Sequence, residues 1–164
     1  MGSDTNARPE DTIMPSSERF FRCTVGAAMR SVIVTCEPDT PLVEIAAQMT
    51  KHRIHCVVVM EAGADRPGAP WALVSDLDLV AAAIEGIDDR VAGQISATPV
   101  VTVTEDEPVW RAAQLMTEYS NPHLVVVDRM TDRPVGILST LDIARVAADL
   151  TASSFDGTST QHTR

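Results

Sequence analysis

The chain has 164 residues, 45% of them apolar, a formal net charge of −10 and a single lysine, Lys51. Proteins that bind nucleic acid draw their affinity from clustered Lys and Arg, so this composition argues against that class. The sequence has no apolar run of the roughly 20 residues needed to cross a bilayer, and its polar start is unlike a signal peptide. A cytoplasmic protein with no membrane contact is expected, and its cysteines, Cys23, Cys36 and Cys56, are expected to be free thiols.

Composition divides the chain into four parts. Residues 1–20 are polar and aperiodic, and residues 151–164 are rich in Ser and Thr, so both ends are predicted to be disordered tails. Between them, residues 21–88 and residues 89–150 carry the same succession of patterns about 65 residues apart. The sequence therefore predicts two repeats of one structural unit.

Each repeat begins with a β-branched run, residues 32–34 or 100–103, that predicts a strand. A helix follows, because apolar residues recur at i, i+3, i+4 and i+7. These residues are Leu42, Ile45, Ala46 and Met49 in the first repeat and Val109, Ala112, Ala113 and Met116 in the second.

The second half of each repeat contains two more strands and a helix. Continuous valines, residues 57–59 or 125–127, predict a strand buried on both faces. Another short apolar strand comes next, and the last helix begins at Ser75 or Ser139. The predicted fold is α+β, with two β-α-β-β-α units. Two copies are too few for a solenoid, so we expect them to pack face to face about a pseudo-twofold axis, with ligand sites between them.

The duplication pairs Ser75 and Asp78 with Ser139 and Asp142, and it also aligns His55 with His123. A Ser-x-x-Asp sequence at a helix start has two interpretations. It can be a capping box, in which Ser and Asp satisfy backbone N–H groups of the first turn. The same helix N-terminus can also bind a phosphate, while the carboxylate accepts hydrogen bonds from ribose hydroxyls. The residues alone leave both interpretations open.

The pattern Val-Thr-Val, a helix, His-Leu-Val-Val-Val-Asp and then Gly-Ile-Leu-Ser-Thr-Leu-Asp resembles the CBS motif, and two in tandem resemble a CBS domain pair, or Bateman module. The resemblance covers nearly all of the chain between the two predicted tails, and it implies a regulatory module that binds AMP, ADP, ATP or S-adenosylmethionine and requires no cofactor. It also implies that Ser contacts phosphate, that Asp holds ribose and that the histidines face the phosphates. The implied ligand-binding residues are Ser75, Asp78, His55, Ser139, Asp142 and His123, with base-side segments Ser31, Val32, Ile33 and Thr98, Pro99, Val100.

The two predicted sites differ in sequence. Gly136, which would let backbone approach a ligand, has Ala72 as its counterpart, and neutral Thr140 has Asp76, whose charge would oppose a phosphate. The site containing Ser139 and Asp142 is therefore predicted to be the better one.

Small residues on the last helices, such as Ala81, Ala82 and Ala144, allow close helix packing, either within the monomer or, as the resemblance implies, in a homodimer formed through these helices. The regulated partner is not predicted. The alternative is a ligand-independent dimerisation or interaction module. No metal site is expected, because His52 ends a helix and Cys56 begins an apolar strand. No catalysis is expected either, since the sequence has neither a Gly-x-Ser-x-Gly elbow nor a glycine-rich phosphate loop.

Overall fold

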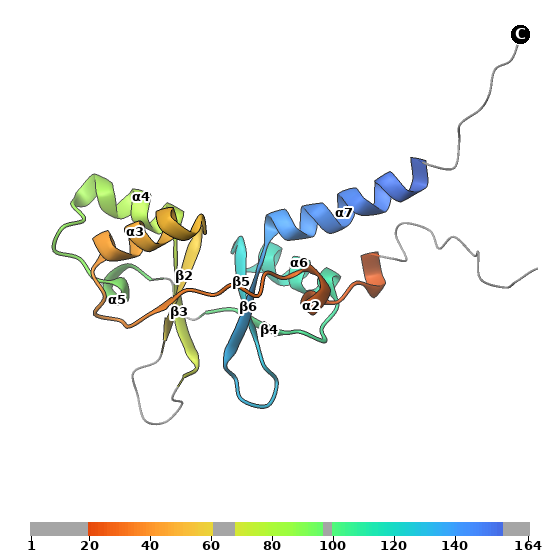
Figure 1. Ribbon diagram of the computed structural model, residues 1–164, viewed down its shortest axis with the longest axis horizontal. Helices are drawn as coiled ribbons and strands as arrows, with labels where there is room; N and C mark the ends of the chain where they lie inside the picture. Colours follow the sequence, from red (N-terminus) through yellow and green to blue (C-terminus); the bar gives the residue numbers. More distant parts are fainter. Residues whose placement is uncertain (1–19, 61–67, 97–99, 156–164) are drawn as a thin grey trace, which may run out of the picture.

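The computed structural model describes residues 20–60, 68–96 and 100–155, with side chains up to residue 148 (Figure 1). Two three-stranded sheets are formed, each flanked by helices. The first half contains α2 (Val25–Ala28), β1 (Thr35–Cys36), α3 (Leu42–His52), β2 (Cys56–Met60), β3 (Pro70–Ser75) and α4 (Asp76–Glu85). The second half contains α5 (Ala92–Ile95), β4 (Thr102–Thr104), α6 (Val109–Glu118), β5 (His123–Val127), β6 (Pro134–Ser139) and α7 (Thr140–Phe155). The predicted α+β architecture of two β-α-β-β-α units is confirmed.

The two sheets have the same topology and equivalent registers. β1 pairs with β2 in parallel and β2 with β3 in antiparallel, in the order β1-β2-β3, and β4, β5 and β6 repeat this arrangement. Cys56 lies opposite Ser75, and His123 lies opposite Ser139. His123 is therefore the structural equivalent of Cys56, and the predicted equivalence of His55 and His123 is wrong by one residue. In the sequence, two runs of valines can be aligned with a shift of one residue and still match. The sheet fixes the alignment, because a shift of one residue would move every side chain of the strand to the opposite face.

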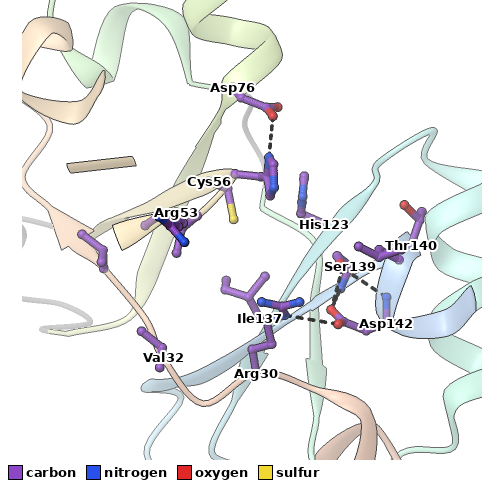
Figure 2. Close-up of a pocket in the computed structure, with 14 residues that line it drawn as sticks. Arg30, Val32, Arg53, Cys56, Asp76, His123, Ile137, Ser139, Thr140 and Asp142 are labelled. Atoms are coloured by element: carbon purple, nitrogen blue, oxygen red, sulfur yellow. Dashed lines mark hydrogen bonds and ion pairs between the residues drawn. The ribbon is translucent and has the colours of Figure 1, made fainter. Parts of the chain in front are cut away.

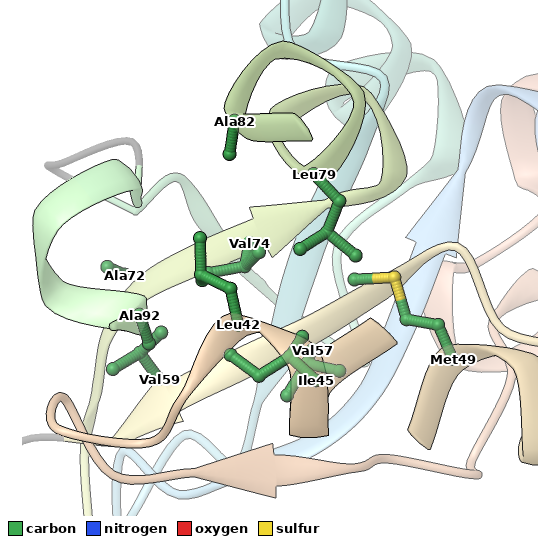
Figure 3. Packing of buried hydrophobic residues seen from close by; sticks show 10 residues of the cluster. All are labelled: Leu42, Ile45, Met49, Val57, Val59, Ala72, Val74, Leu79, Ala82 and Ala92. Carbon is green, nitrogen blue, oxygen red and sulfur yellow. The ribbon is translucent and has the colours of Figure 1, made fainter. Parts of the chain in front are cut away.

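The valine strands supply two different cores, because alternate residues of a strand face opposite sides. Val57 and Val59 pack with α3 and α4 in a cluster that also contains Leu42, Ile45 and Leu79 (Figure 3). Cys56 and Val58 face the other way and pack with Val125 and Val127 of the second repeat. The strand is thus buried on both faces, as predicted, and the two sheets meet face to face.

The short helices α2 and α5, which the sequence did not predict, are exchanged between the repeats. α2 precedes the first repeat but packs on the second, where Val25 and Gly26 donate backbone hydrogen bonds to Glu107 and Glu105. α5 precedes the second repeat but packs on the first, where Ala92 and Gly93 donate to Thr40 and Pro38. Each repeat is therefore completed by a helix from the other half of the sequence.

The exchange changes the path of the chain before each first strand. Residues 32–34 were predicted as a strand, but the strand begins only at Thr35, although the Val34 carbonyl accepts a hydrogen bond from the Val58 N–H of β2. Before them, Arg30 exchanges both backbone hydrogen bonds with Ile137 of β6 at 2.9 Å. α7 also continues beyond the predicted end of the second repeat to Phe155, because the sequence of this helix contains neither Gly nor Pro. Among the described helices, none is both long enough and apolar enough to cross a membrane.

Candidate functional site

A cavity of about 320 Å³ opens between the two repeats (Figure 2). This volume lies at the lower end of the range typical of small-molecule sites. Fourteen residues from both repeats line it: Arg30, Val32, Val34, Arg53, Ile54, His55, Cys56, Asp76, His123, Ile137, Ser139, Thr140, Leu141 and Asp142. Its apolar wall and its polar groups therefore come from segments that are distant in sequence.

The exchanged entry segment explains how these residues meet. Residues 30–34 leave the second repeat at β6 and cross to β1, so that Arg30 and Val32 lie across the cavity from Asp76 of α4, with Arg30 facing Asp142 of α7. The turn after α3 contributes Arg53, which adopts a left-handed backbone conformation with φ of 53° at the helix C-cap. The antiparallel pair β5 and β6 places His123 opposite Ser139 at the same end of the sheet.

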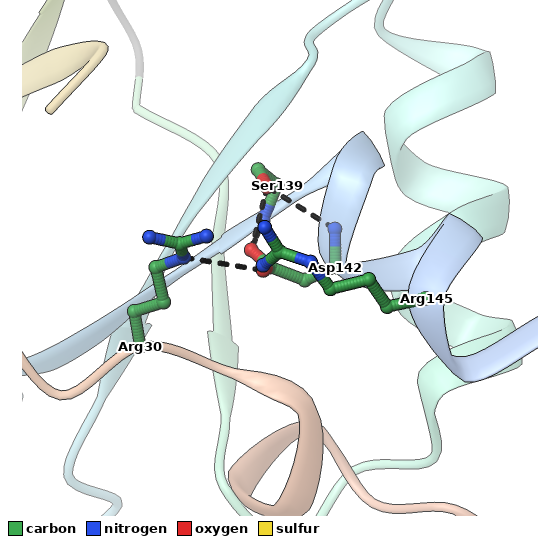
Figure 4. Close-up of polar contacts among 4 residues, drawn as sticks. All are labelled: Arg30, Ser139, Asp142 and Arg145. Carbon is green, nitrogen blue, oxygen red and sulfur yellow. Dashed lines mark hydrogen bonds and ion pairs between the residues drawn. The ribbon is translucent and has the colours of Figure 1, made fainter. Parts of the chain in front are cut away.

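Asp142 is the most completely bonded group of the site. The Ser139 backbone N–H and hydroxyl both donate to Asp142 Oδ2, and the Asp142 N–H donates back to Ser139 Oγ at 3.3 Å. Arg30 Nε at 3.3 Å and an Arg145 terminal nitrogen at 2.8 Å donate to the other oxygen, Oδ1 (Figure 4). Burial, which leaves Asp142 only 3% exposed, would raise its pKa, but the donors on Ser139 and Arg30 outweigh this effect and lower it. Asp142 is therefore a buried carboxylate.

The predicted capping boxes exist in both repeats. Ser75 and Asp78 form the same reciprocal arrangement at the start of α4, with the Ser75 N–H and hydroxyl each 2.7 Å from Asp78 Oδ2. Capping is thus a real role of the motif in each copy. Capping does not remove the N-terminal end of α7 from the cavity wall, because Ser139, Thr140 and Leu141 all line the cavity.

The histidines occupy different environments. His55 Nδ1 lies 2.8 Å from Asp76 Oδ2, and both side chains are exposed to solvent on the cavity rim. His123 is half-buried, its Nδ1 has no hydrogen-bond partner among the described residues, and burial lowers its pKa below the ordinary 6.5. His123 is therefore neutral near pH 7. Asp76, expected to weaken the other site, lines this cavity and is paired with His55.

The structure gathers some of the predicted site residues and separates others. Val32, His55, His123, Ser139 and Asp142 line the cavity. Among the described residues, those predicted for the site that do not line this cavity are Ser31, Ile33, Val100, Gly136, Ser75 and Asp78. Ile33 and Val100 pack instead into the core between the sheets. Thr98 and Pro99 lie outside the described residues.

Gly136 allows a close approach, but by the protein's own chain. A Cβ at this position would overlap Met29 Sδ and would lie 3.0 Å from the carbonyl oxygen of Arg30. The predicted role of Gly136 in approaching a ligand is therefore corrected, because the exchanged segment occupies that space. In the other repeat, the C-cap equivalent of Met29 is the smaller Ser96, and Ala72 stands opposite Val59 as Gly136 stands opposite Val126.

Sequence reasoning did not assign three charged residues of the cavity, Arg30, Arg53 and Asp76, to this site. Arg30 lies just before the predicted base-side segment, and Arg53 lies just after a predicted helix. No sequence motif marks them, and the offset of 67 residues that relates Met49 to Met116 and Cys56 to His123 would only have corrected the pairing of the histidines.

The fold and the cavity define a tandem module of two repeats with a small-molecule site between them, and the family model for the CBS domain matches residues 25–85 and 92–149. The chain belongs to the CBS domain family. An uncharacterised protein of Methanopyrus kandleri is 31% identical over 133 residues, which cover 79% of this chain and 65% of that protein. The chain thus spans slightly less than two thirds of that relative.

Two solved structures show the likeness in three dimensions. The CBS domain protein PAE2072 of Pyrobaculum aerophilum, complexed with AMP, is 26% identical with a TM-score of 0.67, covering 79% of this chain and 99% of that one. The CBS domain pair of protein MJ0100, in complex with 5′-methylthioadenosine and S-adenosyl-L-methionine, shares the fold with a TM-score of 0.69 at 24% identity, covering 77% of this chain and 97% of that one.

Proposed function

We propose that this protein is a ligand-sensing module that binds an adenine nucleotide or a related adenosyl compound in the cavity between its repeats. The observation that carries the proposal is the cavity itself, because residues of both repeats surround a helix N-terminus, a buried carboxylate and an apolar wall. The similar protein PAE2072, whose structure contains AMP, supports the choice of ligand class.

The residues divide by chemistry. Val32, Val34 and Ile137 offer an apolar surface for the base, and Asp142 offers a carboxylate for the ribose hydroxyls. Ser139 and the start of α7 offer N–H groups and the positive end of a helix dipole to a phosphate. Because both repeats line the cavity, a ligand that binds one arrangement of the repeats more tightly shifts the population toward it. The regulated protein would sense that shift.

A second candidate is a homodimerisation or protein-interaction module that needs no ligand, and α4 favours it. Leu77, Val80 and Ile84 are exposed at i, i+3 and i+7, so they form an apolar stripe along one face of this helix. A groove between α3 and α4, lined in part by Ala46, Met49 and Val80, adjoins the stripe. The two functions are compatible if the ligand adjusts how two copies pack.

Thermal shift and calorimetric titration with AMP, ADP, ATP and S-adenosylmethionine test the first candidate. A ligand present at 100 times its dissociation constant stabilises the folded state by about 2.7 kcal/mol. Asp142→Ala should abolish this stabilisation. Asp78→Ala is the matched control. It removes the same capping interaction from α4, and Asp78 does not line the described cavity. No stabilisation of the wild type by any of the four ligands would refute the proposal.

Light scattering tests the second candidate. Val80→Glu places a charge in the middle of the stripe and should convert a dimer into a monomer without loss of fold. Met130→Glu is the control, since Met130 is also an exposed apolar residue but lies in the turn between β5 and β6. A wild-type monomer at all concentrations, or equal effects of the two variants, would contradict dimerisation through α4.

A further inference from the structure

The carboxylate offered to a ribose is already fully engaged by the protein. A carboxylate has about four lone-pair sites, and Asp142 accepts four hydrogen bonds, two from Ser139 and one each from Arg30 and Arg145 (Figure 4). A ligand diol must therefore replace one of these donors. The identity of the donor that leaves determines which ligands the cavity accepts.

Arg30 is the donor that can leave at least structural cost. The two Ser139 contacts belong to the cap of α7, and Arg145 lies on α7 three residues after Asp142, outside the cavity lining. Arg30 makes the longest of the four contacts by donor-to-acceptor distance, 3.3 Å, and its side chain is 56% exposed. Its backbone is held by both hydrogen bonds to Ile137, so the side chain can rotate while the entry segment stays in place.

The charges of the site show where Arg30 would go. Three guanidinium groups, Arg30, Arg53 and Arg145, stand in or beside the cavity against two carboxylates, Asp76 and Asp142. Asp142 keeps Arg145 when Arg30 leaves, and Asp76 keeps His55. Among the described residues, the Arg30 side chain donates a hydrogen bond only to Asp142, and it does so from Nε. The two terminal nitrogens of its guanidinium are therefore available to a ligand. A planar guanidinium with two available nitrogens is suited to a phosphate.

We infer that Arg30 is a specificity-determining residue, an inference that rests on the proposed function. Arg30 competes with the ligand's ribose for Asp142, and when the ligand binds, the Arg30 side chain moves to the ligand's 5′-phosphate. A nucleoside 5′-phosphate gives Arg30 a new anionic partner in place of Asp142, whereas a phosphate-free adenosyl compound displaces Arg30 from Asp142 and offers it no partner. The cavity therefore selects a phosphorylated adenosine over adenosine, 5′-methylthioadenosine or the cationic S-adenosylmethionine.

Calorimetric titration of the full chain with AMP and with adenosine, in wild type and Arg30→Met, tests the inference. Methionine keeps much of the apolar stem of arginine but carries no charge. AMP affinity should fall about tenfold or more, as for loss of a hydrogen bond to a charged group. Adenosine affinity should stay constant or rise by up to about fivefold, the range of a weak exposed ion pair. The selectivity for AMP should thus fall by at least about tenfold.

Arg145→Met is the matched control, because Arg145 bonds to the same oxygen of Asp142 from outside the cavity lining. It should change AMP and adenosine binding by the same factor. Equal losses of AMP and adenosine affinity in Arg30→Met would overturn the inference while leaving the proposed function intact, and so would tighter wild-type binding of adenosine or S-adenosylmethionine than of AMP. If neither wild type nor variant binds any adenosyl compound, the proposed function itself fails and the inference fails with it.

Discussion

Replacing Gly136 with alanine should destabilise the protein, and this loss should be smaller in a protein whose Met29 has already been shortened. The added Cβ would overlap Met29 Sδ, which can move, and would press on the Arg30 carbonyl at 3.0 Å, which is held by the Ile137 N–H. Overpacking of this kind costs about 1–3 kcal/mol. At this chain length 1 kcal/mol corresponds to roughly 3 °C in melting temperature, so Gly136→Ala should melt roughly 3–9 °C below wild type.

The companion variant is Met29→Ser, and together with Gly136→Ala it copies the pair Ser96 and Ala72 from the other repeat. Met29→Ser alone should also destabilise, by about 1–3 kcal/mol, because it removes a half-buried thioether. The double variant should be more stable than the sum of the two losses predicts, with a coupling of about 1 kcal/mol or more, as expected for residues in contact.

Urea denaturation followed by circular dichroism measures all four proteins of this cycle, with the slope checked for constancy between variants. Additive losses would refute the reasoning, because they would mean that Gly136 and Met29 do not share one space. A fully stable Gly136→Ala protein would refute it as well.

Three other predictions concern titratable groups. Because the pKa of His123 is lowered by burial, the folded state resists its protonation, so stability should fall as the pH drops below about 6.5. In His123→Gln this decline should be weaker in denaturation measured from pH 7 to pH 5, and an unchanged slope would contradict it. The lowered pKa of Asp142 contributes stability above about pH 4 that is lost on further acidification, so Asp142→Asn should cost more at pH 7 than at pH 3. Burial raises the pKa of Cys36 to about 11 and of Cys56 to about 12, so iodoacetamide at pH 8 should modify Cys23 first and Cys56 last, by mass spectrometry of timed digests; early labelling of Cys56 would disagree.

Local patterns predicted the longer helices and the valine strands because each depends on neighbours in sequence. The helix positions Leu42, Ile45 and Met49 are buried on α3, and the valines of β2 are buried on both faces. The register of the same valines could not be predicted. A slip of one residue preserves the pattern of continuous valines, but it changes whether His55 or Cys56 is the equivalent of His123.

The candidate site was predicted where a motif marks it and missed where only the tertiary structure assembles it. Ser139 and Asp142 stand out because a capping box has a fixed spacing. Arg30 has no such signal, because it reaches Asp142 only through the exchange of α2, across 112 positions of sequence. The role of Gly136 was misassigned for the same reason, since its neighbour Met29 comes from the other half of the chain.

The exchange of α2 and α5 also has a consequence for the order in which the protein is completed during synthesis. The first repeat can close once α5 has emerged, soon after its own last helix, because the groups that receive α5 are Pro38 and Thr40. α2 is made before either repeat, yet the backbone groups that anchor Val25 and Arg30 belong to Glu107 and Ile137 of the second repeat. α2 must therefore wait for β6, so its docking is complete only after most of the second repeat has been made.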